Sequence, residues 1–220
     1  MRLSEIDDTN RREHHHLTSD DVCFFMWEYV KSERFEQGNT RSLIENLKKK
    51  PSLRGTPQFK YKQPAIRKCA QMLSATLDKN WKGTFVPVPP SKAKGHPDYD
   101  DRMVQVCKLI GHAVDVREIV VQTQSCAANH ESAGNRQTVD DLINIYEIDE
   151  TLCSPEPSAI CIIDDLLTAG THYRAMHTVL KDRFPDCKIF GLFIARRKLP
   201  EVEFPDIDLE EFENIFGKGS

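Results

Sequence analysis

One short stretch, ICIIDDLLTAGTH at residues 160–172, constrains the fold of this chain more than any other. A continuous apolar run ends in two adjacent acids, Asp164 and Asp165, and a loop of small and hydroxyl residues then leads into a helical pattern. Because the apolar run does not alternate with polar residues, it predicts a strand at 159–164 that is buried on both faces. Such strands belong to parallel sheets that are covered by helices.

The segments that follow support the same fold class. An amphipathic helix at 171–184 and a second apolar strand at 187–197 complete a strand–helix–strand unit with right-handed connection. We therefore expect an α/β fold with a mostly parallel sheet flanked by helices. The other predicted elements are helices at 38–50, 61–77 and 102–113, strands at 84–90 and 114–122, a strand or helix start at 20–30, a long loop at 123–137, and a turn of helix followed by a strand at 138–149.

The acid pair predicts a ligand site. In open parallel sheets, ligands bind beyond the carboxyl ends of the strands, which is where Asp164 and Asp165 fall. The N–H groups of the following turn and of the helix start can cradle a phosphate, and Gly170 lets the backbone come close to it. Two acids would repel a bare phosphate, so a sugar phosphate with hydroxyls, or a nearby divalent cation, fits better. Helix capping explains one acid directly before a helix, but not this pair.

These residues resemble a known motif. ICIIDDLLTAGTH is similar to the phosphoribosyl pyrophosphate (PRPP) motif of type I phosphoribosyltransferases, and DDLLTAGT is especially similar to its orotate phosphoribosyltransferase version. FVPVPPSKAKGHPDYDDRM at 85–103 and the segment 120–149 resemble ComF-type, amidophosphoribosyltransferase-like proteins. The resemblance covers residues 84–197 and implies the type I phosphoribosyltransferase fold, with an N-terminal helical or hood appendage.

The resemblance also implies roles for the motif residues. Asp164 and Asp165 would orient the ribose hydroxyls, lie near the developing positive charge, and hold Mg²⁺ through the ligand or water. Thr168 stands where purine-salvage members usually carry aspartate, which makes a hypoxanthine or guanine acceptor less favoured. His172 stands where many members have threonine, and it either donates to the phosphate or lies outside the loop. The residues expected to bind the 5-phosphate are Leu167, Thr168, Ala169, Gly170, Thr171 and His172.

Two other loops are implicated by the same resemblance. The loop after the first core strand, with Pro90, Ser91 and Lys92, would contact pyrophosphate, and in the family it often holds a cis peptide. The alternative is that Lys92 is an ordinary surface lysine. The loop at about 122–137 would close over the ligand, with His130 shuttling a proton and Arg136 meeting the leaving pyrophosphate. Arg102 and Asp101 would lie near the pyrophosphate loop.

The function expected from the resemblance is transfer of a phosphoribosyl group from PRPP, with Mg²⁺, to an unidentified nitrogen acceptor, releasing pyrophosphate. The alternative is a weakly active or inactive nucleotide sensor or accessory protein of the same fold, including one associated with nucleic acid in DNA uptake or defence. We expect an N-terminal appendage at 1–83 in the hood or an interface, a core at 84–200 and an acidic tail at 201–220. A homodimer, or membership of a multi-protein system, is expected, with no membrane partner.

Charge and composition limit the remaining possibilities. The chain has 220 residues and a net charge of −4, and no apolar run approaches the roughly 18 residues that span a membrane. Its N-terminus lacks the apolar core of a signal peptide, so we expect a cytoplasmic protein. The 7 cysteines include no C-x-x-C pair, which disfavours a zinc ribbon or disulfide framework and indicates small buried residues.

Two segments carry charge of one sign. Residues 46–77 contain eight basic residues and no acid, whereas residues 201–213 contain seven acids and no base. These are either two solvated surfaces of opposite sign, or the basic stretch meets phosphates. Residues 1–20 are expected to be polar and frayed, with the three histidines at 14–16 in a solvated turn.

Overall fold

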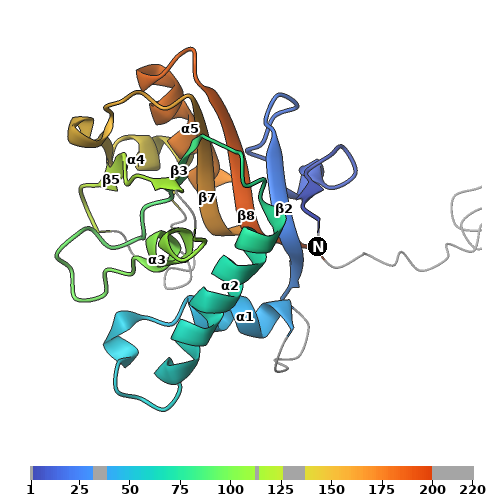
Figure 1. Ribbon diagram of the computed structural model, residues 1–220, viewed down its shortest axis with the longest axis vertical. Helices are drawn as coiled ribbons and strands as arrows, with labels where there is room; N and C mark the ends of the chain where they lie inside the picture. The colour runs from blue at the N-terminus through green and yellow to red at the C-terminus, as the bar shows by residue number, and fades with distance from the viewer. Residues whose placement is uncertain (1, 32–38, 112–113, 126–136, 200–220) are drawn as a thin grey trace, which may run out of the picture.

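The computed structural model describes residues 2–31, 39–111, 114–125 and 137–199. Its main sheet has six strands in the order β1-β2-β8-β7-β3-β4, and only the β1–β2 pair is antiparallel. The α/β prediction is therefore confirmed as a mostly parallel, mixed sheet flanked by helices (Figure 1). The strands are β1 Ser4–Glu5, β2 Cys23–Val30, β3 Thr84–Pro87, β4 Asp115–Val116, β7 Ala159–Leu167 and β8 Lys188–Lys198.

Helices cover both faces of this sheet, as Figure 1 shows for α2 and α5. Successive residues of β7 point to opposite faces, so Cys161 and Ile163 pack with α1, α2 and α3, whereas Ile160 and Ile162 pack with α4 and α5. This two-sided burial explains the continuous apolar run in the sequence. The helices are α1 Thr40–Leu47, α2 Lys62–Thr76, α3 Arg102–Lys108, α4 Val139–Ile143 and α5 Thr171–Arg183, with short 3-10 turns η1 Arg11–Glu13, η2 Pro51–Leu53, η3 Phe59–Tyr61 and η4 Glu150–Leu152.

The predicted βαβ unit is present as β7, α5 and β8. However, β7 continues three residues beyond the expected end at Asp164, because β8 is long enough to pair with Leu166 and Leu167. Asp165 is therefore a strand residue, as Asp164 was expected to be, and the loop begins at Thr168. As neighbours in a strand, their side chains leave the backbone in opposite directions.

Two other predicted elements differ from the structure. The strand expected at 114–122 is divided: β4 pairs with β3, whereas β5 (Val120–Gln122) pairs with β6 (Tyr146–Ile148) in a separate antiparallel sheet. Arg117 N–H still bonds to the β3 carbonyl of Phe85, and the chain then changes sheets. The helix expected at 102–113 ends at Lys108, shortly before Gly111, which has a φ of +80°.

The N-terminal region belongs to the same sheet as the predicted core. Its strand β2 lies parallel to β8, and α1 and α2 pack on one face. The expected division at residue 83 thus does not separate two sheets. The expectation that residues 1–20 are frayed is wrong, because Ile6 and Leu17 are buried in the core on the α5 side. The solvated turn is also wrong for His14, which is 0% exposed.

The cysteines follow their predicted role as small buried residues. All six that the structure describes, Cys23, Cys69, Cys107, Cys153, Cys161 and Cys187, are buried and unpaired. Burial raises the pKa of Cys23, Cys69 and Cys107 to about 12, so these thiols stay protonated at neutral pH. Over the described ranges, no helix has both the length and the apolar character to cross a membrane.

Candidate functional site

The topology places one preferred ligand position at the carboxyl ends of β3 and β7. These strands are neighbours, yet the chain leaves β3 through α3 on one face and leaves β7 through α5 on the other. Ligands in open parallel sheets bind where the connections diverge in this way. The loop at 89–92 follows β3 and the loop at 168–170 follows β7, so the structure brings both predicted binding loops to one edge.

The acid pair, on β7, lies beside the end of the shorter neighbouring strand β3. β3 ends at Pro87, which pairs with Ile163, and the Val88 N–H donates to the Ile163 carbonyl at 3.0 Å. β7 then continues for four residues to Leu167 with β8. Asp164 and Asp165 therefore lie just beyond the last residue pair of β3 and β7, beside the start of the loop that follows β3.

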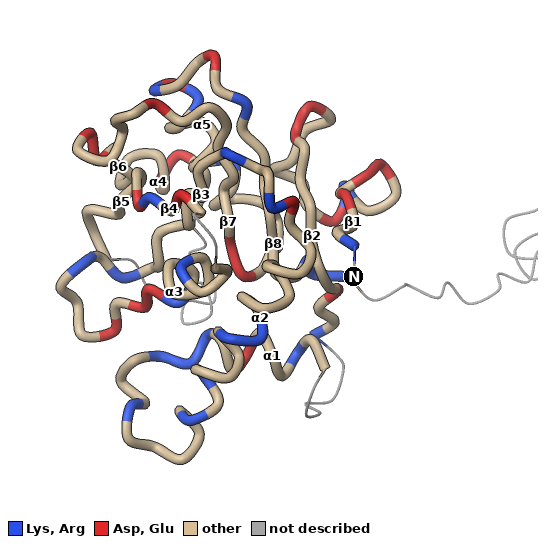
Figure 2. The backbone as a smooth tube through the Cα atoms, in the orientation of Figure 1, with Lys and Arg blue, Asp and Glu red and all other residues tan. Residues whose placement is uncertain are grey.

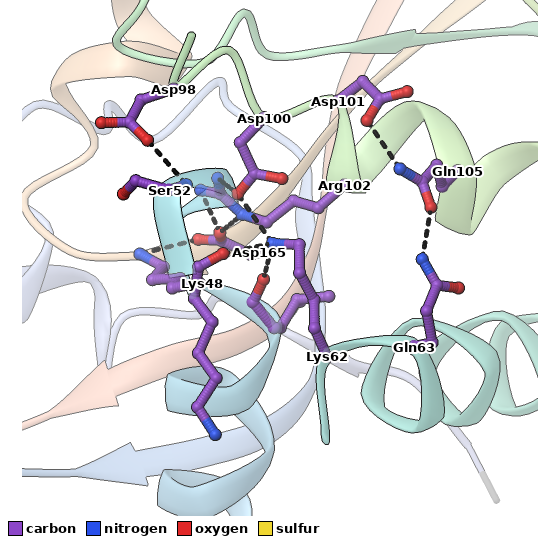
Figure 3. Close-up of polar contacts among 12 residues, drawn as sticks. Lys48, Ser52, Lys62, Gln63, Asp98, Asp100, Asp101, Arg102, Gln105 and Asp165 are labelled. Atoms are coloured by element: carbon purple, nitrogen blue, oxygen red, sulfur yellow. Dashed lines mark hydrogen bonds and ion pairs between the residues drawn. The ribbon is translucent and has the colours of Figure 1, made fainter. Parts of the chain in front are cut away.

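Asp165 is 1% exposed and its two carboxylate oxygens are paired with cations. Lys48 Nζ lies 2.9 Å from Oδ1, and Arg102 Nε and Nη2 each lie 2.6 Å from Oδ2 (Figure 3). Burial alone would raise the pKa of Asp165, but Arg102 and Lys48 outweigh it and hold the pKa well below its usual range. Asp165 is thus ionised and neutralised from within the protein.

The pairing continues away from Asp165. Arg102 Nη1 also lies 2.9 Å from Asp100, which in turn accepts from the buried Lys62 at 2.8 Å. Lys62 Nζ donates to the carbonyls of Leu47 and Lys49 at the end of α1, at 2.7 and 2.8 Å. A chain of alternating charge therefore joins α1, α2, α3 and β7.

This chain revises the interpretation of the basic stretch at 46–77. Lys62 is buried and pairs with Asp100, and the partly exposed Lys48 is directed inward to Asp165, so neither is simply a solvated surface lysine. The other basic residues of the stretch lie along the loop that joins α1 to α2 and on α2 itself (Figure 2). The acidic segment at 201–213 lies outside the described residues.

Asp164 has a different environment from its neighbour. Its side chain is half-buried, and its Oδ1 accepts the Asp165 N–H at 2.7 Å. Burial and the negative charge of Asp165 raise the pKa of Asp164, although Lys48 and Arg102 partly oppose this. The structure therefore divides the predicted pair: Asp165 is committed to internal cations, whereas Asp164 is the carboxyl left for a ligand.

The loop after β7 opens α5 without a side-chain cap. Gly170 is the N-cap residue, with a left-handed φ of +90° that a glycine adopts at no steric cost. The first intrahelical bond runs from Arg174 N–H to Gly170 O at 2.9 Å. In the described part of the chain, the N–H groups of Thr171 and His172 have no hydrogen-bond partner. Thr168 is exposed and Ala169 half-buried, so the loop can meet an anion from solvent.

His172 lies in the first turn of α5, next to the loop rather than in it. Its Nδ1 is 2.9 Å from the hydroxyl of Tyr146 on β6. Burial lowers the pKa of His172 to about 4, and Lys48 acts in the same direction. The imidazole is therefore neutral at neutral pH.

The sequence did not single out Tyr146 or Lys48 as site residues. The acid-free basic stretch was the only sequence signal for Lys48.

The predicted pyrophosphate loop packs against β5. Gln122 Nε2 donates to the Ser91 carbonyl at 2.9 Å, and a cavity of about 20 Å³ is bordered by Pro90, Lys92 and Gln122 among others. That volume is enough for about one water molecule. Within the described chain, the only cis peptide is Ser154–Pro155, so the cis bond expected in this loop is not present. His130 and Arg136, with most of the expected lid, lie outside the described residues.

The same geometry determines which side chains at the candidate site could hold Mg²⁺. The described residues include no group of three or more His, Cys, Asp or Glu side chains that could hold a metal ion. Asp165 is paired with Lys48 and Arg102, which leaves Asp164 as the carboxylate that would hold the ion. Mg²⁺ bound through one carboxylate, with phosphate oxygens and water as its other ligands, is typical of phosphate-transfer sites.

The sequence was also compared with protein-family models and with curated proteins, and neither comparison gave a match. The assignment of this site therefore depends on its geometry and on the motif residues themselves.

Proposed function

We propose that this site binds PRPP and transfers its phosphoribosyl group to a nitrogen acceptor, with release of pyrophosphate, as a type I phosphoribosyltransferase does. One observation carries the proposal. The uncapped N-terminus of α5, opened by the left-handed Gly170, follows a strand that carries an acid pair near its carboxyl end, where the sheet connections diverge. A ligand with a phosphate and adjacent hydroxyls matches both parts.

The proposed ligand would lie across the edge of the sheet. Its 5-phosphate meets the N–H groups of Thr171 and His172, and its ribose hydroxyls meet Asp164. Its pyrophosphate lies towards the loop that contains Lys92. Arg102, which opens the helix after that loop, and Lys48 add positive charge there, and both are held in place by Asp165. Asp165 is thus a positioning residue in this proposal.

The proposed reaction breaks the bond between ribose carbon 1 and the pyrophosphate oxygen and forms a bond from carbon 1 to the acceptor nitrogen. Carbon 1 gains oxocarbenium character as pyrophosphate leaves with the bonding electron pair. In its ionised form, Asp164 stabilises the positive charge that develops on carbon 1, while the basic residues stabilise the leaving group. Mg²⁺, when bound, would neutralise pyrophosphate charge.

A nucleotide-binding protein without transfer activity is the second candidate. The pairing of Lys48 and Arg102 with Asp165 favours it, because cations already neutralised by a carboxylate offer less charge to leaving pyrophosphate. This candidate uses the same site and the same phosphate loop.

The test measures PRPP binding by calorimetry and pyrophosphate release with Mg²⁺ and a panel of bases and amines. Asp164→Asn should weaken PRPP binding or turnover by about a hundredfold, as expected for a lost charged contact, without unfolding the protein. Asp182→Asn, at an exposed acid on α5, is the matched control. PRPP binding with no turnover for any acceptor supports the second candidate, and no PRPP binding at all overturns both.

A further inference from the structure

The phosphate loop is contacted by a segment from the other end of the chain, residues 10–21, which we term the N-terminal strap. His14 Nδ1 hydrogen-bonds to the carbonyl of Thr168. The His16 N–H donates to the Ala169 carbonyl at 2.9 Å. A Cβ built on Gly170 would lie 3.2 Å from Leu17 Cδ2, so this side chain packs directly on the glycine. Three consecutive loop residues are thus each in contact with the strap.

The strap is also fixed to the helix that the loop opens. Arg174 Nε on α5 donates to the His16 carbonyl at 3.0 Å, and its guanidinium pairs with Asp21. Asp21 is 5% exposed and accepts the N–H of Thr18 at 2.6 Å, which closes the turn of the strap. The strap, the loop and the start of α5 therefore form one connected unit.

These contacts determine where the loop N–H groups point. In a planar trans peptide, the C=O of one residue and the N–H of the next point in opposite directions. Since the carbonyls of Thr168 and Ala169 point towards the strap, the N–H groups of Ala169 and Gly170 point away from it. In the described chain these two N–H groups have no hydrogen-bond partner, which leaves them available to an anion.

The chemistry of His14 shows which of its atoms matters. The Thr168 carbonyl can only accept, so Nδ1 carries the proton and donates. Nε2 is buried with no partner among the described residues. An apolar side chain would fill this 0%-exposed position without leaving an unpaired nitrogen. The Nδ1 donor is therefore the feature that favours histidine here.

We infer that His14 is a positioning residue for phosphate binding: through its bond to Thr168, the N-terminal strap turns the Ala169 and Gly170 N–H groups towards the ligand. This inference rests on the proposed function, because it concerns the 5-phosphate end of the same site. It adds a determinant that lies more than 150 residues away in the sequence.

The experiment compares His14→Leu with His14→Asn, whose side-chain N–H lies where Nδ1 does. Calorimetry with ribose 5-phosphate and, separately, with inorganic pyrophosphate distinguishes the two ends of the site. His14→Leu should weaken ribose 5-phosphate binding about tenfold, the effect of about one hydrogen bond, while pyrophosphate binding stays within about twofold. His14→Asn should restore most of the affinity. His15→Leu, at the exposed neighbouring position, should bind as the wild type does.

Each outcome bears on the inference. Unchanged ribose 5-phosphate binding in His14→Leu would overturn it while leaving the proposed function intact. An equal loss of affinity for both ligands would also overturn it, because that indicates a general structural role. Wild-type protein that binds neither PRPP nor ribose 5-phosphate would overturn the proposed function and this inference together. If His14→Leu does not fold, His14→Gln replaces it, since its amide reaches the Nε2 position and lacks the Nδ1 donor.

Discussion

Lys48 at the end of α1 lies 2.9 Å from Asp165 on β7 and so connects the N-terminal region to the acid pair of the candidate site. Asp165 is buried and also pairs with Arg102, whose guanidinium reaches it from α3. The acid pair is a short contiguous motif in the sequence, but its ion pairs involve residues from three separate elements. These ion pairs therefore link the stability of this edge of the sheet to the geometry of the candidate site.

Arg102→Met should destabilise the protein by about 3–5 kcal/mol, because it leaves the buried Asp165 with the partly exposed Lys48 as its cationic partner among the described residues and removes a partner from Asp100. Lys48→Met should cost less, since Lys48 is more exposed than Arg102. Urea unfolding at pH 7 measures both. If Arg102→Met were within about 1 kcal/mol of the wild type, the ion pairs would not hold this site together.

Asp164→Asn should increase stability at neutral pH, although it should weaken ligand binding. Burial and the charge of Asp165 raise the pKa of Asp164, so the folded protein holds this proton more tightly than the unfolded chain does. Stability of the wild type is therefore lost as pH rises from about 4, the ordinary carboxyl pKa, to the raised folded-state pKa. The gain from asparagine should grow over this window by about 1.4 kcal/mol for each unit of the shift, and then stay constant.

Urea unfolding of wild type and Asp164→Asn between pH 4 and pH 8 tests this. Asp182→Asn, which replaces an exposed acid, is the control for loss of a negative charge. A stability difference that is independent of pH, or that favours the wild type at pH 8, would contradict the raised pKa.

Lys62→Met should destabilise the protein by about 2–4 kcal/mol, because the Lys62 ammonium satisfies two carbonyls at the end of α1 as well as Asp100. Hydrogen exchange should become faster in α1 in particular. The control is Lys60→Met, at an exposed position two residues earlier, which should change stability by less than about 0.5 kcal/mol. Equal effects of the two substitutions would show that burial of Lys62 is unimportant.

How far the sequence predicts this molecule depends on the range of each interaction. The apolar run at 159–164 and the helix at 171–184 have strong local patterns, so they predict the βαβ unit and place the acid pair near the carboxyl end of its first strand. The end of β7 was not, because Leu166 and Leu167 are strand residues only through pairing with β8. The split of the strand at 114–122 likewise depends on two different partner strands.

The candidate site also depends on long-range contacts that the sequence does not reveal. Asp164 and Asp165 are equivalent in the sequence, and only the tertiary contacts with Lys48 and Arg102 make one paired and the other available. His14 belongs to a polar segment with no hydrophobic period, and nothing near it indicates that it meets Thr168. Contacts between residues so far apart in the chain leave no local pattern to detect.

The strap also predicts a pH effect on stability. Burial lowers the pKa of His14, and this outweighs the hydrogen bond with the Thr168 carbonyl, which acts to raise the pKa. As pH falls below about 6.5, the unfolded chain takes up a proton that the folded protein resists, so this contribution to stability is lost towards acid. Urea unfolding from pH 7.5 to 5 should show wild type losing stability relative to His14→Asn. A constant difference across this range would contradict a neutral, buried His14.

Gly170→Ala should cost more than glycine substitutions at other left-handed positions. Gly170 and Gly55 have similar φ values, +90° and +86°, but a Cβ at Gly55 meets nothing within 4 Å, whereas one at Gly170 meets Leu17 at 3.2 Å. Gly55→Ala should therefore lower stability only by the backbone strain, about 1–2 kcal/mol. Gly170→Ala should lower it by that strain and, in addition, by the free energy needed to displace the strap. In a double-mutant cycle by urea unfolding, Leu17→Ala should partly relieve Gly170→Ala. Strictly additive effects would mean that the strap does not press on the phosphate loop.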